Sequence, residues 1–238
     1  MAQNEKIGTK SDSKKQENQN FITRTIDFYN KHQQIIYGVL IALLVVAFGI
    51  VAASKFYFQP RNQKAATLIL APIQYYGQAV NSGDTTAFNL ALEGDEENEG
   101  FLTLISSYKM TKIANTSNYY AGLCYLGMGQ KEEALEHFLK FKKKEDVFWY
   151  ACQMAIADIY DEQGDDAKAI KYYKNTINGN EPFYTPPALF KLGQMYEKAE
   201  NWKEAYNAYT KIEKDFNKEY QSMGVDRFLE RAKIKSGN

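Results

Sequence analysis

The chain has 238 residues, of which 45% are hydrophobic and 14% aromatic, and its formal net charge is zero. The charge is unevenly distributed, because residues 1–61 carry eight Lys/Arg and four Asp/Glu, whereas residues 62–238 carry twenty-one and twenty-five. With the basic excess confined to the N-terminal part and no basic patch elsewhere, the sequence excludes nucleic acid as an expected partner.

Residues 1–20 contain no aromatic and almost no large aliphatic side chain, so they cannot bury enough surface to order themselves. We therefore expect a disordered tail, on the cytoplasmic side of a membrane. Residues 21–34 place Phe21, Ile22 and Ile26 at helical spacing. This segment is either an interfacial helix or an extension of the helix that follows, and the sequence leaves both alternatives open.

Residues 35–54 form a run of twenty residues without a charge, the length that crosses about 30 Å of hydrocarbon as a helix. Together with the aromatic residues that follow, they predict a transmembrane helix over 35–58. A signal peptide is the alternative, but the apolar run is longer than 7–15 residues and begins far from the first residue. The short basic tail favours a cytoplasmic N-terminus and a translocated remainder.

Residues 62–112 predict a degenerate helical repeat region. Pro72 indicates a bend, because proline removes a helical hydrogen bond, and Asp84 is a candidate N-cap for a second short helix. The acidic stretch 93–100 lacks the ligand pattern of a calcium loop, so we expect a solvated loop there.

Three related copies of one helix–turn–helix pattern follow over residues 115–218. Four landmarks recur in each copy at separations of 35 and 36 residues: Gly122, Ala157 and Gly193; Tyr125, Tyr160 and Tyr196; Ala134, Ala169 and Ala205; and Phe138, Tyr173 and Tyr209. The small residues let two helices approach closely, and the aromatic residues fill the space between successive hairpins. The repeated spacing predicts a stack of helix pairs that bury their faces only against one another.

The ends of the copies carry turn signals. The first two copies place Gly between their helices, in "GMGQ" and "EQGD", whereas the third has "AENW", so its turn is expected to be built differently. Pro186 and Pro187 suit the first turn of a helix in the third copy. Residues 219–238 predict one capping helix with Met223, Phe228 and Leu229 facing inward.

This pattern resembles the tetratricopeptide repeat, an antiparallel helix pair of about 34 residues. The resemblance implies an all-α fold in which one transmembrane helix precedes a right-handed helical solenoid. It also implies a concave groove lined by the first helix of each copy. The corresponding residues here are Tyr119, Tyr120, Leu123 and Leu126 in the first copy, Met154, Ala155, Asp158 and Asp161 in the second, and Phe190, Lys191, Gln194 and Glu197 in the third.

Members of this repeat class that bind a C-terminal carboxylate use Lys and Asn at the groove positions. Aromatic and acidic residues stand there in this chain, so that specificity is not expected. An apolar and acidic groove suits an extended or helical segment of an unfolded protein. The alternative, that helices from 62–112 cover the residues of the first copy, remains open.

No constellation for catalysis is present in the sequence. His32 and His137 lie far apart, and there is no nucleophile–base set, phosphate-binding Gly loop or metal-ligand cluster. Cys124 and Cys152 have no ligand-like spacing, and buried packing is expected for them ahead of a disulfide. We therefore expect no enzyme, no cofactor, no metal and no small-molecule substrate.

The layout of basic tail, single span and degenerate then regular repeats resembles the membrane-anchored tetratricopeptide proteins found as the ancillary subunit of the bacterial Sec translocon. That resemblance implies a single-pass protein of the bacterial inner membrane with a periplasmic repeat domain. It would act as an ancillary subunit or chaperone-like adaptor beside the translocon channel, with a periplasmic chaperone and unfolded clients as partners. The alternative is a structural scaffold for another cell-envelope assembly machine.

Overall fold

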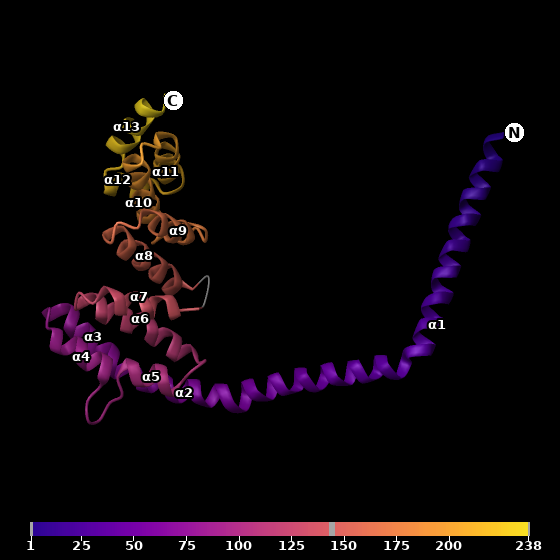
Figure 1. Cartoon of the computed structure of the whole chain (residues 1–238), viewed down its shortest axis with the longest axis horizontal. Helices are drawn as coiled ribbons and strands as arrows, with labels where there is room; N and C mark the ends of the chain where they lie inside the picture. Colours follow the sequence, from indigo (N-terminus) through magenta and orange to yellow (C-terminus); the bar gives the residue numbers. More distant parts are fainter. Residues whose placement is uncertain (1, 143–145, 238) are drawn as a thin grey trace. The chain divides into compact units, whose positions relative to one another are not determined.

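The computed structural model describes residues 2–142 and 146–237, with the side chains of residues 23–61, 63–142 and 146–237. The chain is all-α and divides into two compact units, Met1–Pro60 and Arg61–Asn238 (Figure 1). The first unit holds α1, Ala2–Ala53, and the short π-helix η1, Ser54–Phe58. The helix α2, Gln59–Leu68, begins at the boundary between the two units.

The helical run Thr23–Ser82 contains a segment that is long and apolar enough to cross a membrane, judged by length and composition within the described residues. Within the described residues, none of the side chains of its most apolar stretch is buried: Leu44 is 70% exposed and Phe48 is 76% exposed. A helix of a soluble protein would turn part of such a surface towards a core. The long apolar helix expected from the sequence is therefore present.

The backbone of α1 differs from the expected domain boundaries in two ways. It is helical from Ala2, where the sequence predicted a disordered tail over 1–20, and it continues unbroken through 21–34. Lys, Gln and Glu are good helix formers, and an existing helix adds residues without the cost of a new nucleus. Of the two alternatives for 21–34, the structure has the simple helical extension.

The second unit contains three helical hairpins that coincide with the three sequence copies (Figure 1). Within each hairpin the two helices pack against each other, and each hairpin packs against the next. The pairs are α6 (Lys112–Gly127) with α7 (Lys131–Lys140), α8 (Val147–Glu162) with α9 (Asp166–Ile177), and α10 (Thr185–Lys198) with α11 (Trp202–Asp215). The predicted all-α repeat fold is confirmed.

The small landmarks lie where the two helices of a hairpin approach each other, as predicted, but they meet the aromatic landmarks of the same hairpin, which were expected between successive hairpins. A Cβ added at Gly122 would lie 2.6 Å from the ring of Phe138, and one at Gly193 would collide with the ring of Tyr209. The rings of Phe138 and Tyr209 are fully buried. A glycine on the first helix thus makes room for the ring of the second helix, and a larger residue would have to displace a buried aromatic side chain.

The turn of the third copy is built like the other two, which corrects the expectation from its missing glycine. Gly129 and Gly164 have φ +76°, and Glu200 adopts the same left-handed conformation at φ +55°. The backbone hydrogen bond that closes each turn is also the same. It runs from Gln130 N to Tyr125 O (2.9 Å), from Asp165 N to Tyr160 O (2.9 Å), and from Asn201 N to Tyr196 O (2.8 Å). The stacked helices impose this turn even on a residue with a Cβ.

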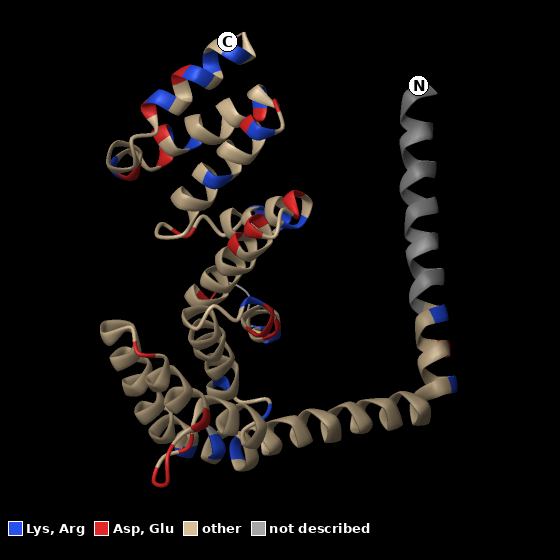
Figure 2. Ribbon diagram, turned by 60° about the vertical axis from the view of Figure 1, so that its left-hand side comes forward, with Lys and Arg blue, Asp and Glu red and all other residues tan. Residues whose placement is uncertain are grey.

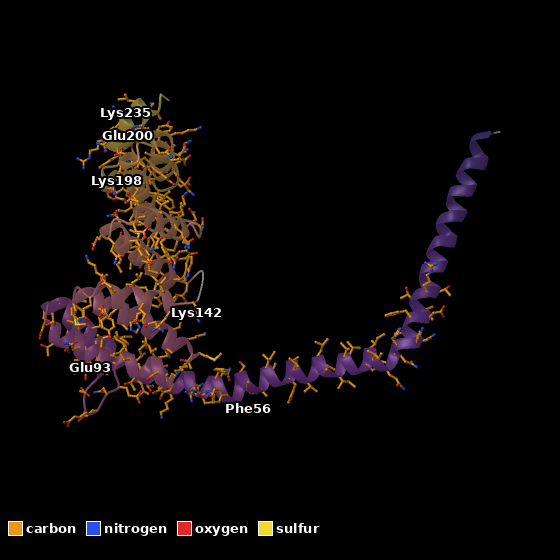
Figure 3. The ribbon with its side chains drawn as sticks, in the orientation of Figure 1. Phe56, Glu93, Lys142, Lys198, Glu200 and Lys235 are labelled. Carbon is orange, nitrogen blue, oxygen red and sulfur yellow. The ribbon has the colours of Figure 1, made fainter. Side chains whose placement is uncertain are left out.

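We expect Glu200→Gly to stabilise the repeats by about 0.5–1 kcal/mol, measured as the free energy of chemical unfolding of the full chain in detergent. Removing the Cβ of a left-handed residue relieves about 1–2 kcal/mol of strain in the folded state. Glycine also gives the unfolded chain more conformational freedom, which offsets about 0.4–1 kcal/mol of that gain. Gly164→Glu is the matched control and should destabilise by a similar amount. A loss of stability in Glu200→Gly would contradict this account of the turn, whose position is labelled in Figure 3.

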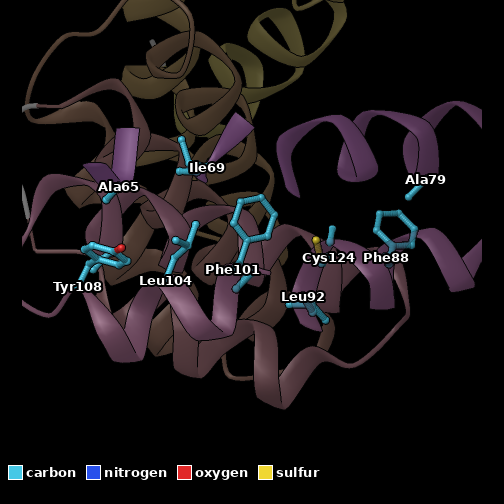
Figure 4. Packing of buried hydrophobic residues seen from close by; sticks show 12 residues of the cluster. Ala65, Ile69, Ala79, Phe88, Leu92, Phe101, Leu104, Tyr108 and Cys124 are labelled. Atoms are coloured by element: carbon cyan, nitrogen blue, oxygen red, sulfur yellow. The ribbon is translucent and has the colours of Figure 1, made fainter. Parts of the chain in front are cut away.

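Before the repeats, α3 (Leu70–Ser82), α4 (Thr85–Glu93) and α5 (Phe101–Ser107) pack onto α6. The expected bend is the break at Ile69, because Pro72 cannot donate a hydrogen bond to the carbonyl of Leu68. Asp84 is the predicted N-cap, and its Oδ1 accepts from Thr86 N at 2.8 Å. The core here joins residues from all of these helices, as Figure 4 shows for Phe88, Leu92, Phe101, Leu104 and Cys124.

The C-terminal region contains two helices, where one capping helix was expected over 219–238. They are α12, Asn217–Met223, and α13, Asp226–Ser236, separated by Gly224 at φ +61°. The helix α13 packs against α11. Leu229 is buried there, and Met223 and Phe228 are partly buried in the same cluster.

Candidate protein-binding groove

A groove of about 670 Å³ lies along the first helices of the three repeats, α6, α8 and α10. It collects side chains from all three copies, so it exists only because the hairpins stack. Eight of the twelve residues that the resemblance implied line it: Tyr119, Leu123, Leu126, Met154, Ala155, Asp158, Asp161 and Lys191.

The apolar part of the groove is formed by α6 and α8. The ring of Tyr119 packs against Phe148, with centroids 4.8 Å apart. Burial raises the pKa of Tyr119, so its hydroxyl stays protonated at neutral pH. Leu126 is 36% exposed at the other end of the same face. This wall offers apolar and aromatic surface to a bound chain.

The charged part of the groove consists of acids on α8 and lysines from the neighbouring helices. Lys191 Nζ lies 4.0 Å from Asp161 Oδ2, and Lys131 forms an ion pair with Glu162. Asp158 accepts a hydrogen bond of 2.6 Å from the Tyr173 hydroxyl of α9. A partner can exchange these half-exposed ion pairs at little cost, since exposed pairs contribute about 0–1 kcal/mol.

The pKa of Asp158 is raised above its ordinary value, mainly because burial disfavours the carboxylate. The Tyr173 hydroxyl and Lys191 oppose this shift, and Asp161 and Glu162 add to it. A carboxyl group with a raised folded-state pKa contributes stability below its unfolded pKa, and that contribution is lost as pH rises through the folded pKa. Ionised Asp158 is therefore a cost to the fold at neutral pH.

Asp158→Asn keeps an acceptor for Tyr173 and removes the charge. We expect its melting temperature, relative to the unsubstituted chain, to rise as pH is raised from about 4 to about 7. Asp165→Asn is the control of opposite sign, since Lys168 lowers the pKa of Asp165. Its relative melting temperature should fall over the same range. Parallel pH profiles for the two variants would contradict the assignment.

Four of the implied groove residues lie elsewhere. Tyr120 packs between Tyr76 and Phe101, with centroids 5.6 Å and 5.4 Å away, so the N-terminal helices do cover this residue of the first copy. The ring of Phe190 packs against the ring of Phe228 of α13, with centroids 4.9 Å apart. Gln194 is partly exposed and does not line the groove. Glu197, also implied by the resemblance, accepts from Arg231 Nε at 3.1 Å.

The groove also contains residues that the sequence analysis did not select. These are Lys131, Ala151, Ile159, Glu162 and Tyr184. Lys131 begins a second helix and Tyr184 precedes α10, so neither occupies a first-helix position of the repeat pattern. Whether these two residues reach the groove depends on how neighbouring hairpins pack. Tyr184 could have been found from the sequence only by examining the turn that joins the second copy to the third.

The remaining reactive side chains are used in packing. Cys124 and Cys152 are free, buried thiols, and burial raises the pKa of Cys124 to about 12. His137 Nδ1 lies 3.1 Å from Asn118 Oδ1, and burial lowers the pKa of its imidazole. In the acidic loop, the Asp95 carboxylate accepts hydrogen bonds from the backbone N–H groups of Glu97 and Asn98. Over the described residues, no group of three His, Cys, Asp or Glu could hold a metal ion.

Comparison with known proteins agrees with this geometry. Two tetratricopeptide repeat families match the chain, one at residues 117–145 and 187–216 and the other at residues 151–182. No curated protein matches it in sequence. The three hairpins are therefore similar to tetratricopeptide repeats over the matched residues.

Two solved structures share the fold. One is a crystal structure of nearly identical TPR-like repeats of a putative kinesin light chain from Podosopora anserina, with 14% identity and a TM-score of 0.50. It covers 69% of this chain and 86% of that one. A glutamine-to-methionine variant of it has the same identity, a TM-score of 0.51, and coverage of 69% and 85%. At this identity the likeness shows the fold alone.

Proposed function

We propose that this protein binds segments of other proteins in its α6–α8–α10 groove while its apolar N-terminal helix holds it in a membrane. The observation that carries the proposal is the groove, which places Tyr119, Met154 and Asp158 from two repeats on one concave surface. A mixed apolar and acidic lining accepts peptide segments of varied sequence, because it offers general burial together with exchangeable charges.

For the membrane, we propose a single-pass arrangement with residues 35–58 as the span. The exposed apolar helix supports it, as do exposed Phe56 and Tyr57 at the end of the apolar run, where aromatic rings favour the interface. The basic N-terminal segment favours a cytoplasmic N-terminus, which places the repeats in the periplasm of a bacterial cell.

For the partner, we propose that the module is an ancillary, chaperone-like subunit at the bacterial protein translocon and receives secreted or envelope proteins there. Support comes from the layout of one basic tail, one apolar helix and a repeat array. Tethering raises the effective concentration of a groove near the emerging chain, so weak contacts suffice. The alternative of a scaffold for another envelope machine requires one folded partner at fixed stoichiometry.

The decisive experiment is site-specific photo-crosslinking of the full chain in native membranes, with mass spectrometry of the adducts. Probes replace Tyr119 and Met154 in the groove, and matched probes replace Tyr120 and Phe190, which other helices cover. Groove adducts to the translocon channel and to many unfolded secreted proteins are expected, with few from the covered positions. Adducts to one folded envelope protein would replace the translocon proposal by the scaffold. Equal adducts from all four positions would refute a groove function.

A separate experiment tests the membrane arrangement. Reporter enzymes active only in the periplasm or only in the cytoplasm are fused after residue 238 of the full chain. Activity of the periplasmic reporter alone is expected, and activity of the cytoplasmic reporter would overturn the orientation without affecting the groove proposal.

A further inference from the structure

A second cavity, of about 680 Å³, shares no lining residue with the groove. Four lysines from two separate parts of the chain line it: Lys109 before α6 and Lys112 at its first residue, and Lys140 at the last residue of α7 and Lys142 just after it. Within the described residues no Asp or Glu lines it. Figure 2 shows the charges on the ribbon, and Lys142 is labelled in Figure 3.

The lysine-bearing segments are held together by hydrogen bonds. Asn115 Oδ1 accepts from Lys142 N at 3.1 Å, which ties the chain after α7 to α6. Thr111 donates from its hydroxyl to Tyr108 O at 2.6 Å and caps α6. Glu136 pairs with Lys140 at 2.5 Å. These hydrogen bonds thus fix a concavity lined by lysines, and Glu136 partly neutralises Lys140.

The rim of the cavity is joined to Arg61, the first residue of the second unit. The Arg61 guanidinium donates a hydrogen bond to the carbonyl of Ser107, and the preceding residue, Ser106, lines the cavity. Arg61 follows Phe58 by three residues, about 5 Å along a helix at about 1.5 Å per residue. The residue that contacts the rim of the cavity therefore follows the end of the proposed span, Phe58, by only three residues along the chain.

An apolar side chain stands among the lysines. Met110 is 87% exposed, and its φ of +65° places it in the left-handed region between Lys109 and Thr111. An exposed methionine side chain is not stabilised by contact with water. An apolar side chain flanked by lysines suits the interface of a membrane that contains anionic lipids, where the lysines contact headgroups and the apolar side chain contacts acyl chains. Charge and apolarity point to the same kind of partner.

We propose that this cavity binds the headgroup of an anionic phospholipid, with the lysine ammonium groups donating to its phosphate and Met110 entering the acyl boundary. The contact would hold the repeat unit against the membrane from which its chain emerges. The inference rests on the proposed membrane anchor and adds a specific lipid partner to it.

The test uses the full chain in lipid nanodiscs, with a fluorophore on Ser106→Cys. This position is exposed at the cavity, and the native thiols are buried and resist labelling. Quenching by headgroup-spin-labelled phosphatidylglycerol is compared with quenching by spin-labelled phosphatidylcholine. We expect at least about threefold stronger quenching by the anionic lipid, weakened by salt. The triple variant Lys109→Gln, Lys112→Gln and Lys142→Gln should lose this preference.

The control removes the same charge elsewhere, through Lys203→Gln, Lys211→Gln and Lys214→Gln on α11, and should keep the preference. Equal quenching by both lipids, or an unaffected cavity variant, would overturn the proposal while leaving the anchor intact. Inorganic phosphate is also added and compared with chloride at the same ionic strength. If phosphate alone abolishes the preference for the anionic lipid, the cavity is a site for free phosphate and the lipid proposal is overturned. A chain that fails to enter nanodiscs would overturn both anchor and lipid site.

Discussion

Ala169→Trp is expected to destabilise the repeat unit by about 1–3 kcal/mol or more, the cost of forcing a large side chain into a packed interior. Ala169 is fully buried in α9, in a cluster that includes Tyr173, Leu192 and Met195. Since these residues come from the second and third hairpins, the indole would separate two repeats as well as the two helices of one. The measurement is chemical unfolding of the full chain in detergent, followed by circular dichroism.

The matched control is Ala167→Trp, two residues earlier on the same helix, where the side chain is exposed. Surface substitutions of this kind change stability by about 0.5 kcal/mol or less. Equal unfolding free energies for the two tryptophan variants would show that Ala169 is not at the junction of the hairpins, and the repeat register would have to be abandoned.

Ala155→Trp is expected to lower the yield of groove photo-crosslinks at least about tenfold, equivalent to about 1.4 kcal/mol of binding free energy. Ala155 lines the groove on α8 and is partly exposed, so an indole there occupies the space that a bound segment would take. Because the new side chain extends into an open concavity, it should change the unfolding free energy far less than Ala169→Trp does.

Ala167→Trp is again the control, because it adds the same side chain outside the groove lining. Crosslink yields from the Tyr119 and Met154 probes should be unchanged in that variant. If Ala155→Trp also leaves the yields unchanged, partners bind on another face. If it unfolds the chain, the groove at this position is closed in solution.

Comparison of single residues shows where sequence reasoning succeeds. Gly122 allows the close approach of α6 and α7 that was predicted, because the helix pair repeats a local pattern that each copy satisfies by itself. Asp84 caps α4 because a side chain and a backbone N–H two residues apart need no distant partner. The same local reasoning went wrong at Glu200, since stacking of the whole array outweighs the conformational preference of one residue.

The groove shows the opposite situation. Tyr119 and Tyr120 are neighbours in the sequence with the same expected role, yet one lines the groove and the other is covered by Tyr76 and Phe101. Phe190 is a groove residue by position in the repeat, but α13 packs on it. The basic cavity could not be expected either, because Lys109 and Lys142 are thirty-three residues apart and come together only when α7 folds back along α6.

The sequence by itself determined the all-α repeat, its register and the long apolar helix, because each depends on spacings within a few turns of one helix. The tertiary structure decided which groove residues are open, how the third turn is built, and where the lysines gather. These depend on the helices that flank the repeats and on stacking between hairpins. Such contacts join residues far apart in the chain and leave no local periodicity to read.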